Sequence, residues 1–266
     1  MKPPNPVYRI IVVRTVQASL LGLIAHWLLH WPLTGPHALG LFLTPALCLY
    51  FLFVFVAPWS WGLPILTRLA SREPVIALTF DDGPSPTTLP VLDVLREHDV
   101  KATFFVLGEA VTRHPDTLRR IVAEGHSVGI HAYCHRPFTL LGFAEIEGEI
   151  QRTREAVMRA CPDAAALNWL RPPHGFKSLR LLWGAKQSGV LLVTWSVDGR
   201  DYRDYSSEQI VRNVLCKLQP GAIVLLHDCE GNAATVAALS LLLPEIQVRG
   251  YHAAILIGAQ QVEKKA

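Results

Sequence analysis

The residues with the clearest capacity for chemistry are two adjacent carboxylates and two histidines. Asp81 and Asp82 are neighbours, and His131 and His135 are four residues apart. One carboxylate and two imidazoles can hold a divalent ion and leave coordination positions open for water and substrate. Such an ion lowers the pKa of its bound water to about 7 and polarises a carbonyl group. The second carboxylate is then free to act as a base on that water, so the pattern predicts metal-assisted hydrolysis.

Two further residues complete this chemistry. Adjacent carboxylates need nearby positive charge to stay ionised together. The ion supplies one such charge, and Arg171 can supply another. His227 can protonate a leaving amine as a general acid.

These residues follow short apolar, β-branched segments that predict strands. Beyond Pro74 there are seven such segments, namely 75–80, 103–107, 126–130, 168–170, 190–197, 222–226 and 253–257. They alternate with helix-like stretches, the last of which starts after a capping residue, Ser206. This alternation predicts an α/β domain with parallel strands. Five of the seven segments are followed directly by polar residues that could take part in this chemistry. In parallel barrels the active site lies at these carboxyl ends of the strands.

The N-terminal region accounts for an apolar excess in the composition. Hydrophobic residues make up 50% of the chain and charged residues 18%, and the mean hydropathy is +0.27. The segments at about 10–30 and 39–57 each have the roughly 20 residues that cross a bilayer. We therefore expect residues 1–70 to be a membrane anchor with two transmembrane helices, and residues 71–262 to be the catalytic domain.

The placement of basic residues predicts the topology of this anchor. Lys and Arg occur before the first span and after the second, but not in the connection between them. By the positive-inside rule, both ends and the catalytic domain would face the cytoplasm of a bacterial-type inner membrane. Alternatively, the first segment is a cleaved signal peptide, although no small-x-small cleavage site follows it. The domain would then face outward.

Charge and cysteine content exclude other classes. A net charge of +3 gives no indication of a nucleic-acid partner. The five cysteines show no CxxC spacing, so neither a zinc ribbon nor a disulfide framework is predicted. We expect Cys229 to be a small buried residue rather than a nucleophile. Arg136 could contact an anionic substrate group or cap local structure.

In its motifs the chain resembles the polysaccharide deacetylase family (NodB-like, carbohydrate esterase family four), from about residue 74 to residue 258. Residues 79–84 read TFDDGP, which is the first family motif, and residues 131–135 read HAYCH, which matches both histidines of H-[ST]-x-x-H. The resemblance implies a distorted (β/α)7 barrel, the NodB homology domain. It also implies Asp81 as the catalytic base. The implied ligands of a divalent metal, Zn²⁺ first and Co²⁺, Ni²⁺ or Fe²⁺ as alternatives, are Asp82, His131 and His135.

Three more motifs follow in the family's order. Residues 171–175 (RPPHG) are similar to R-P-P-Y-G, residues 198–202 (DGRDY) to D-x-x-D-W, and residues 225–227 (LLH) to L-x-H. In the family these motifs supply an arginine that pairs with the base, a backbone N–H for the oxyanion, residues that shape the pocket, and the general acid. The implied catalytic residues besides Asp81 are Arg171, Asp198, Asp201 and His227. The implied substrate or oxyanion contacts are Pro173, His174, Tyr202 and Leu225.

The chain departs from the family pattern at three positions. Ala132 replaces the usual hydroxyl residue, so we expect a hydrogen bond that braces the ligand loop to be absent. His174 replaces Tyr, but the oxyanion donor there is a backbone N–H, which survives a side-chain change. Tyr202 replaces Trp in a sugar-facing position. All ionisable catalytic residues are present, so we expect activity on a shifted substrate.

The expected function is metal-dependent removal of an N-acyl group, N-acetyl in the first place, from an amino sugar. Asp81 takes a proton from water, and His227, oriented by Asp201 or Asp198, protonates the leaving nitrogen. A cytoplasm-facing site suits a lipid-linked saccharide, and a lipid-linked sugar deformylase would use the same mechanism. An outward-facing site suits peptidoglycan or exopolysaccharide.

Two other classes share parts of the pattern. Non-haem iron oxygenases also use two histidines and a carboxylate. They predict an H-x-D spacing on a β-sandwich, whereas here the carboxylate lies far before both histidines in an α/β pattern. A catalytically inactive, membrane-bound glycan-binding protein is the second alternative. Loss of Asp81 or His227 would mark such a protein, and both are present.

Overall fold

The computed structural model describes residues 45–47, 49, 65–164 and 167–256. The chain divides into two units, Met1–Ala57 and Pro58–Ala266, and the description below concerns the second. The expected transmembrane segments, 10–30 and 39–57, lie outside the described residues except at 45–47 and 49, so they stay predictions. Within the described ranges, no helix combines the length and the apolar character needed to cross a bilayer.

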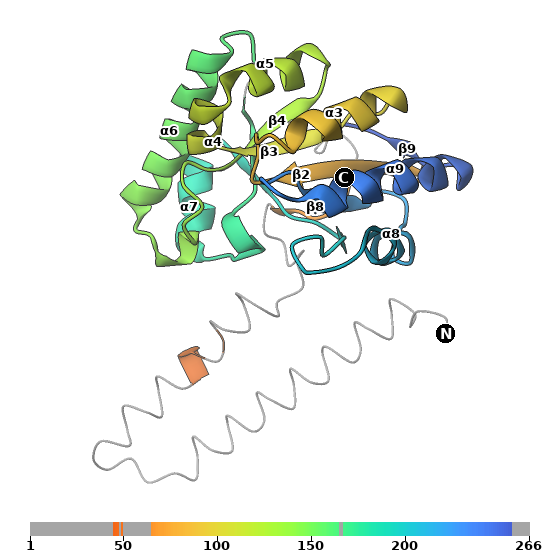
Figure 1. Ribbon diagram of the computed structural model, residues 1–266. Helices are drawn as coiled ribbons and strands as arrows, with labels where there is room; N and C mark the ends of the chain where they lie inside the picture. The colour runs from red at the N-terminus through yellow and green to blue at the C-terminus, as the bar shows by residue number, and fades with distance from the viewer. Residues whose placement is uncertain (1–44, 48, 50–64, 165–166, 257–266) are drawn as a thin grey trace, which may run out of the picture. The chain divides into compact units, whose positions relative to one another are not determined.

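Parallel strands form the centre of this unit (Figure 1). In chain order they are β1 (Ile65–Leu66), β2 (Val75–Asp81), β3 (Thr103–Leu107), β4 (Ser127–Ala132), β5 (Trp169–Leu170), β6 (Leu191–Val193), β7 (Val197–Asp198), β8 (Ile223–His227) and β9 (His252–Ala253). Across the sheet the order is β1-β6-β5-β4-β3-β2-β8-β7, and β9 pairs with the start of β2. Neighbouring strands pair in parallel throughout the described residues, which gives a curled, open half-barrel.

Helices pack around these strands (Figure 1). They are α3 (Thr88–Glu97), α4 (Gly108–Arg113), α5 (Pro115–Ala123), η2 (Phe138–Leu140), α6 (Phe143–Ala160), η3 (Pro173–Gly175), α7 (Leu179–Gln187), α8 (Ser207–Leu215) and α9 (Ala233–Val248). The N-terminal cap expected from the sequence is confirmed, because the Ser206 hydroxyl accepts a hydrogen bond from the Gln209 N–H at the start of α8.

Alternation along the strands separates two apolar clusters. In β2, Ile76, Leu78 and Phe80 belong to the large cluster under the helices. Ala77 belongs to a smaller cluster on the opposite face of the sheet. Successive strand residues point to opposite faces, so Thr79 and Asp81 share the face of Ala77. The strand period therefore brings Asp81 to the concave side of the half-barrel.

The expected parallel α/β architecture is confirmed, but the strand count of seven was wrong. Nine strands occur within the described ranges, because the run 190–197 divides into β6 and β7 and because β1 precedes the first expected strand. The division has a physical cause. The Thr194 N–H still bonds to O of Leu66, the last residue of β1 (2.9 Å), whereas the Ser196 N–H bonds to Ile223 O of β8 (3.0 Å). The chain thus changes partner strand within one strand-like run, in which only Thr194 and Ser196 are polar.

Candidate active site with a metal-ligand cluster

Asp81 is the last residue of β2 and Asp82 follows it, and the two side chains point to different partners. Asp81 keeps the extended conformation of the strand, and its carbonyl accepts the Asp228 N–H at 3.1 Å. Asp82 has φ of 74°, in the left-handed region that few residues other than Gly, Asn and Asp adopt. Gly83 follows, where a Cβ atom would collide with the Asp228 carboxylate. This turn sends one carboxylate toward Arg171 and the next toward the histidines.

The three expected metal ligands lie together. The Nε2 atoms of His131 and His135 are each 3.3 Å from Oδ1 of Asp82, and the three ligand atoms all lie within 4.8 Å of one another. Nδ1 of His131 lies 2.8 Å from the Arg171 carbonyl. A carbonyl only accepts, so this contact places the hydrogen on Nδ1 and leaves the Nε2 lone pair facing Asp82.

The protonation states in this cluster also fit a cation. Burial lowers the pKa of His135, which favours the neutral ring that binds metals. Burial works to raise the pKa of Asp82, but the hydrogen bond and positive charge that His131 and His135 offer when protonated outweigh it and hold that pKa well below its usual range, so the carboxylate stays ionised beside a cation. Oδ1 of Asp82 is buried without a hydrogen-bond partner. Because a buried acceptor without a partner is costly, this oxygen between two imidazole nitrogens fits a bound divalent ion.

Asp81 pairs with a buried arginine. Arg171 is fully buried, and its Nη1 donates to Oδ1 of Asp81 and to the Thr79 hydroxyl, each at 2.7 Å. Its Nη2 donates to Thr194 O at 3.1 Å, where β6 has ended. The guanidinium stacks over the Phe105 ring, 4.1 Å from the centroid. Arg171 is thereby fixed from several directions, and it orients one oxygen of Asp81 while the other is 4.0 Å from His131 Nδ1.

His227 pairs with Asp201. Its Nδ1 is 2.7 Å from Oδ1 of Asp201, and its backbone N–H donates to Oδ2 of the same carboxylate at 2.7 Å. The Thr235 hydroxyl also donates to Oδ2, at 2.5 Å, which fixes the carboxylate. Burial works to lower the pKa of His227, but the hydrogen bond and charge of Asp201 outweigh it and raise this pKa to about 9. The imidazole therefore holds its proton at neutral pH.

Strand register brings the two pairs together. Asp81 in β2 and His227 in β8 are register partners on adjacent strands. Leu225, two residues earlier in β8, shares the face of His227 and is only 2% exposed. The base, the metal ligands and the acid expected from the sequence thus meet at one end of the sheet.

Of the two candidates to orient the acid, Asp201 contacts His227. Asp198 instead accepts the Tyr202 hydroxyl at 3.1 Å and the Arg200 N–H at 2.8 Å. The Tyr202 ring is 55% exposed and meets the His227 ring edge-to-face, with 5.5 Å between centroids. Asp198 therefore positions an exposed aromatic ring beside the acid.

The Pro173–Gly175 turn lies next to a metal-ligand candidate. His174 has φ of 60°, is exposed, and packs edge-to-face on His135, with ring centroids 4.6 Å apart. Pro173 is buried beneath it. Gly175 is required here because its φ is 69° and a Cβ atom would lie 2.5 Å from the Trp195 ring. The turn places the His174 ring against His135, one of the candidate ligands.

The structure also shows the surroundings of Arg136 and Cys229, whose roles the sequence left open. Arg136 lies 3.5 Å from Glu145, and both side chains are more than half exposed, so it forms a solvent-exposed ion pair. The Cys229 side chain is half-buried, and burial raises its pKa to about 11. A thiol in that state is a poor nucleophile, in agreement with the expectation for Cys229.

Sequence reasoning missed two buried carboxylates that support the site. Asp228 is fully buried behind Gly83, its carboxylate accepts the Thr88 hydroxyl at 2.5 Å, and burial raises its pKa to about 7. Glu149 of α6 is also buried and bonds to the loop that follows β4. For Glu149 a signal was available, because the helical period places it on the same apolar face as Ile146 and Ile150.

Comparisons with known proteins agree with this geometry. The polysaccharide deacetylase family model matches residues 68–193. The chain is 41% identical over 189 residues to a chitooligosaccharide deacetylase of Bradyrhizobium sp. (strain ANU 289), covering 66% of this chain and 86% of that protein. It is 36% identical over 194 residues to a peptidoglycan-N-acetylglucosamine deacetylase of Bacillus cereus, covering 71% and 70% respectively.

A solved structure extends the match to the fold. The Bc1960 peptidoglycan N-acetylglucosamine deacetylase, in complex with 4-naphthalen-1-yl-N-oxidanyl-benzamide, is similar with a TM-score of 0.70 and 33% sequence identity. The similar region covers 75% of this chain and 95% of that chain. With its motifs, its half-barrel and its relatives in agreement, the chain belongs to the polysaccharide deacetylase family, carbohydrate esterase family four.

Proposed function

We propose that the protein hydrolyses the N-acetyl group of an amino sugar in a glycan. The observation that carries this proposal is the position of Asp81 and His227, which are register partners beside one set of metal ligands. Arg171 holds the first residue and Asp201 the second. The similar proteins are named as deacetylases of chitooligosaccharide and of peptidoglycan N-acetylglucosamine, which supports a glycan substrate over a lipid-linked sugar deformylase or an inactive glycan-binding protein.

The metal is part of the proposal. Two imidazole nitrogens and one carboxylate, with further positions open, form the ligand set of a catalytic zinc site. Zn²⁺ is the first choice, and Co²⁺, Ni²⁺ or Fe²⁺ are alternatives with the same ligands. When bound, the ion supplies a Lewis acid for the amide carbonyl and lowers the pKa of water.

The protein's own groups carry the proton transfers. Asp81 accepts a proton from the water that attacks the acyl carbon, and Arg171 keeps its carboxylate oriented. The backbone N–H of His174 is assigned to the oxyanion. His227 donates its proton to the nitrogen as the C–N bond breaks, and the products are acetate and a free amine. Asp201 holds the ring in the orientation that this donation needs.

The remaining candidates are assigned to the sugar and its acyl group. The Tyr202 ring is exposed beside His227, where it can stack on a sugar ring. Leu225 shares the face of His227 and offers an apolar wall for a methyl group. In these assignments Tyr202 contacts a sugar ring of the substrate and so affects the preferred length of the glycan, and Leu225 contacts the acyl group.

The membrane anchor is proposed from the sequence. Two spans within residues 1–70 would hold the catalytic unit at an inner membrane, with the domain facing the cytoplasm. A cytoplasmic site would meet amino sugars while they are lipid-linked, and an outward site would meet peptidoglycan or exopolysaccharide. A C-terminal reporter fusion that is active on one side of the membrane only would decide between these substrates.

The test of the proposed activity uses the full-length chain in detergent, chito-oligosaccharides and peptidoglycan fragments, and acetate release as the readout. We expect Asp81→Asn to lower kcat/KM by about 10²–10⁴-fold, because the general base is lost. Metal content should stay that of the wild type, because Asp81 is not a ligand. Wild-type activity in this variant, or no acetate release by the metal-loaded wild type from either glycan, would refute the proposal.

A further inference from the structure

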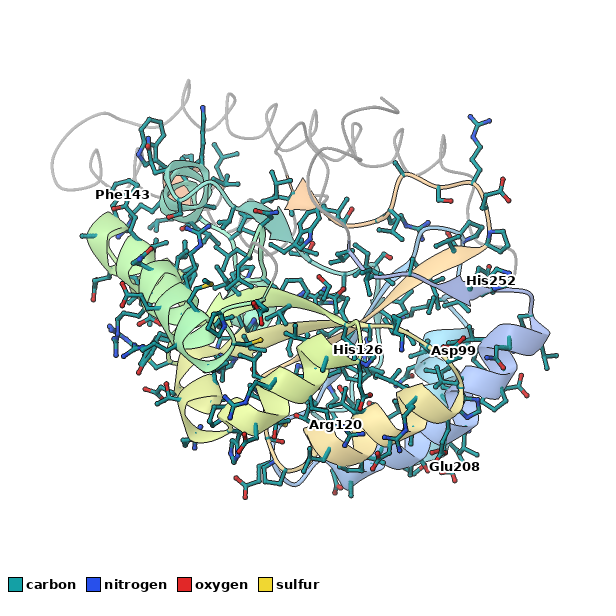
Figure 2. All side chains as sticks on the ribbon, turned by 90° about the horizontal axis from the view of Figure 1, so that it is seen from above. Asp99, Arg120, His126, Phe143, Glu208 and His252 are labelled. Atoms are coloured by element: carbon teal, nitrogen blue, oxygen red, sulfur yellow. The ribbon has the colours of Figure 1, made fainter. Side chains whose placement is uncertain are left out.

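We propose that Glu149 is a positioning residue that orders the segment between the two histidine ligands and so sets the metal affinity of the site. This inference rests on the proposed function in one respect, which is that the Asp82–His131–His135 cluster binds a divalent ion. Glu149 lies on α6, which Figure 2 shows running from its labelled first residue, Phe143. It lies 16 residues beyond Tyr133 in the sequence, and none of the family motifs includes it.

Glu149 bonds directly to the ligand loop. Its Oε2 accepts the backbone N–H groups of Tyr133 and Cys134, at 2.8 and 2.9 Å. Its Oε1 accepts the Cys134 thiol at 3.3 Å. Tyr133 and Cys134 lie between the two histidine ligands, directly after β4 ends at Ala132. One carboxylate thus binds two consecutive amides of the segment that connects one ligand to the other.

Burial makes these bonds strong. Glu149 is only 5% exposed, and a buried carboxylate costs free energy unless hydrogen-bond donors compensate it. Backbone N–H groups that donate to a carboxylate form charge-assisted bonds, which are about twice as strong as neutral ones. The backbone of the helix at this point is itself fixed, because the Thr153 hydroxyl donates to Glu149 O at 2.7 Å.

The two histidines differ in what else holds them. His131 lies within β4, and its Nδ1 bonds to the Arg171 carbonyl. His135 lies beyond the strand, with its side chain 35% exposed, and it contacts Asp82 and the rings of His131 and His174. The position of His135 therefore depends on the loop before it, and Glu149 fixes the backbone of that loop.

The sequence explains why a helix outside the loop supplies this support. Position 132, where the family usually has a hydroxyl residue, is a fully buried alanine that can donate no side-chain bond. The Tyr133 ring adds a second hold, because it packs against Gly108 and under the Arg152 guanidinium, 3.7 Å from the ring centroid. Glu149 provides the polar part of the support that the local sequence lacks.

The test measures Zn²⁺ binding to the metal-stripped, full-length protein by calorimetric titration, without any substrate. We expect Glu149→Ala to weaken Zn²⁺ binding by about 10–100-fold, the usual effect of removing a partner of a ligand shell. Glu149→Gln should lose less, because its amide oxygen can still accept the two N–H groups. Glu147→Gln is the matched control, since it removes an exposed carboxylate from the same helix and should bind Zn²⁺ like the wild type.

The melting temperature of each metal-free variant separates this role from a merely structural one. A residue that only stabilised the fold would lower that temperature and leave the Zn²⁺ affinity unchanged. Wild-type affinity in both Glu149 variants would overturn the proposal, and so would an equal loss in Glu147→Gln. If Glu149→Ala does not fold, the Zn²⁺ affinity of Glu149→Gln relative to the wild type tests the proposal. Absence of deacetylase activity beside the expected order of Zn²⁺ affinities would refute the proposed function alone.

Discussion

Two carboxylate–cation pairs of equal length face each other across the site, and they differ in the cation. Asp81 and Arg171 are 2.7 Å apart and both are buried, with the guanidinium held by strand residues and the Phe105 ring. Asp201 and His227 are also 2.7 Å apart, but the His227 side chain is 13% exposed and lies at the end of its strand. Arginine keeps its charge at any ordinary pH, whereas histidine can release its proton.

In the proposed mechanism, this difference gives the two pairs different roles. A permanent cation beside Asp81 can orient that carboxylate but cannot exchange protons with it. Asp201 instead raises the pKa of a group that is able to give a proton away. The two ion pairs have the same length but different proposed roles, because Arg171 keeps its charge and His227 can release its proton.

The largest effect, on both stability and activity, is expected when the buried Asp81–Arg171 pair loses its arginine. Arg171→Met leaves Asp81 buried without its counter-charge, and we expect a loss of about 3–5 kcal/mol in the free energy of unfolding. Deacetylation should fall below detection. Urea denaturation and acetate release measure the two effects.

A double variant serves as the control for this prediction. Asp81→Asn together with Arg171→Met removes both charges, so stability should return to within about 1–2 kcal/mol of the wild type while activity stays absent. Equal destabilisation of the single and double variants would show that Arg171 acts by packing on Phe105 rather than through its charge.

A smaller effect, on the pH dependence of activity, is expected when the Asp201–His227 pair loses its carboxylate. Asp201→Asn removes the charge that raises the pKa of His227 to about 9, so that pKa should fall toward its ordinary value. The proposed reaction needs His227 protonated. The alkaline limb of the kcat/KM profile should therefore move to lower pH, and the maximal rate should fall by about 10²-fold. A profile measured across the alkaline range tests this, and an unmoved limb would count against His227 as the acid.

The smallest effect is expected at Asp228, behind the base. Burial raises the folded-state pKa of Asp228 from 3.8 to about 7, so the wild type loses stability as the pH rises through about 7. Asn cannot ionise. Between about pH 6 and about pH 8.5, Asp228→Asn should therefore gain about 1–2 kcal/mol relative to the wild type. Parallel denaturation curves at the two pH values measure this, and a constant difference would contradict it.

How much of the site the sequence predicts depends on how local its causes are. Asp81, Asp82, His131 and His135 were predictable because strand ends and short spacings bring them together. The helical period places Glu149 on the apolar face of α6, but its role was missed because that role depends on how α6 packs against the loop after β4. The assignment between Asp198 and Asp201 stayed open for the same reason, since only the fold shows which carboxylate reaches His227.

The same distinction between local and distant causes applies to the fold. Apolar segments and their alternation with helices predicted the parallel sheet, whose strands are defined by their own residues. The break between β6 and β7 was missed because residues 190–197 form one strand-like run, in which Thr194 and Ser196 give no turn signal. The change of partner from Leu66 to Ile223 depends on neighbours that lie elsewhere in the chain.

The left-handed conformation of Asp82 affects how substitutions at this position can be interpreted. Most side chains are strained at φ of 74°, so a scan of position 82 combines two losses, the ligand charge and the turn that separates it from Asp81. Asn tolerates this conformation and has nearly the same shape, so Asp82→Asn removes the charge alone. Asp82→Gly keeps the turn and removes the ligand entirely. Only these two replacements report on coordination, and a β-branched residue would report mainly on the backbone.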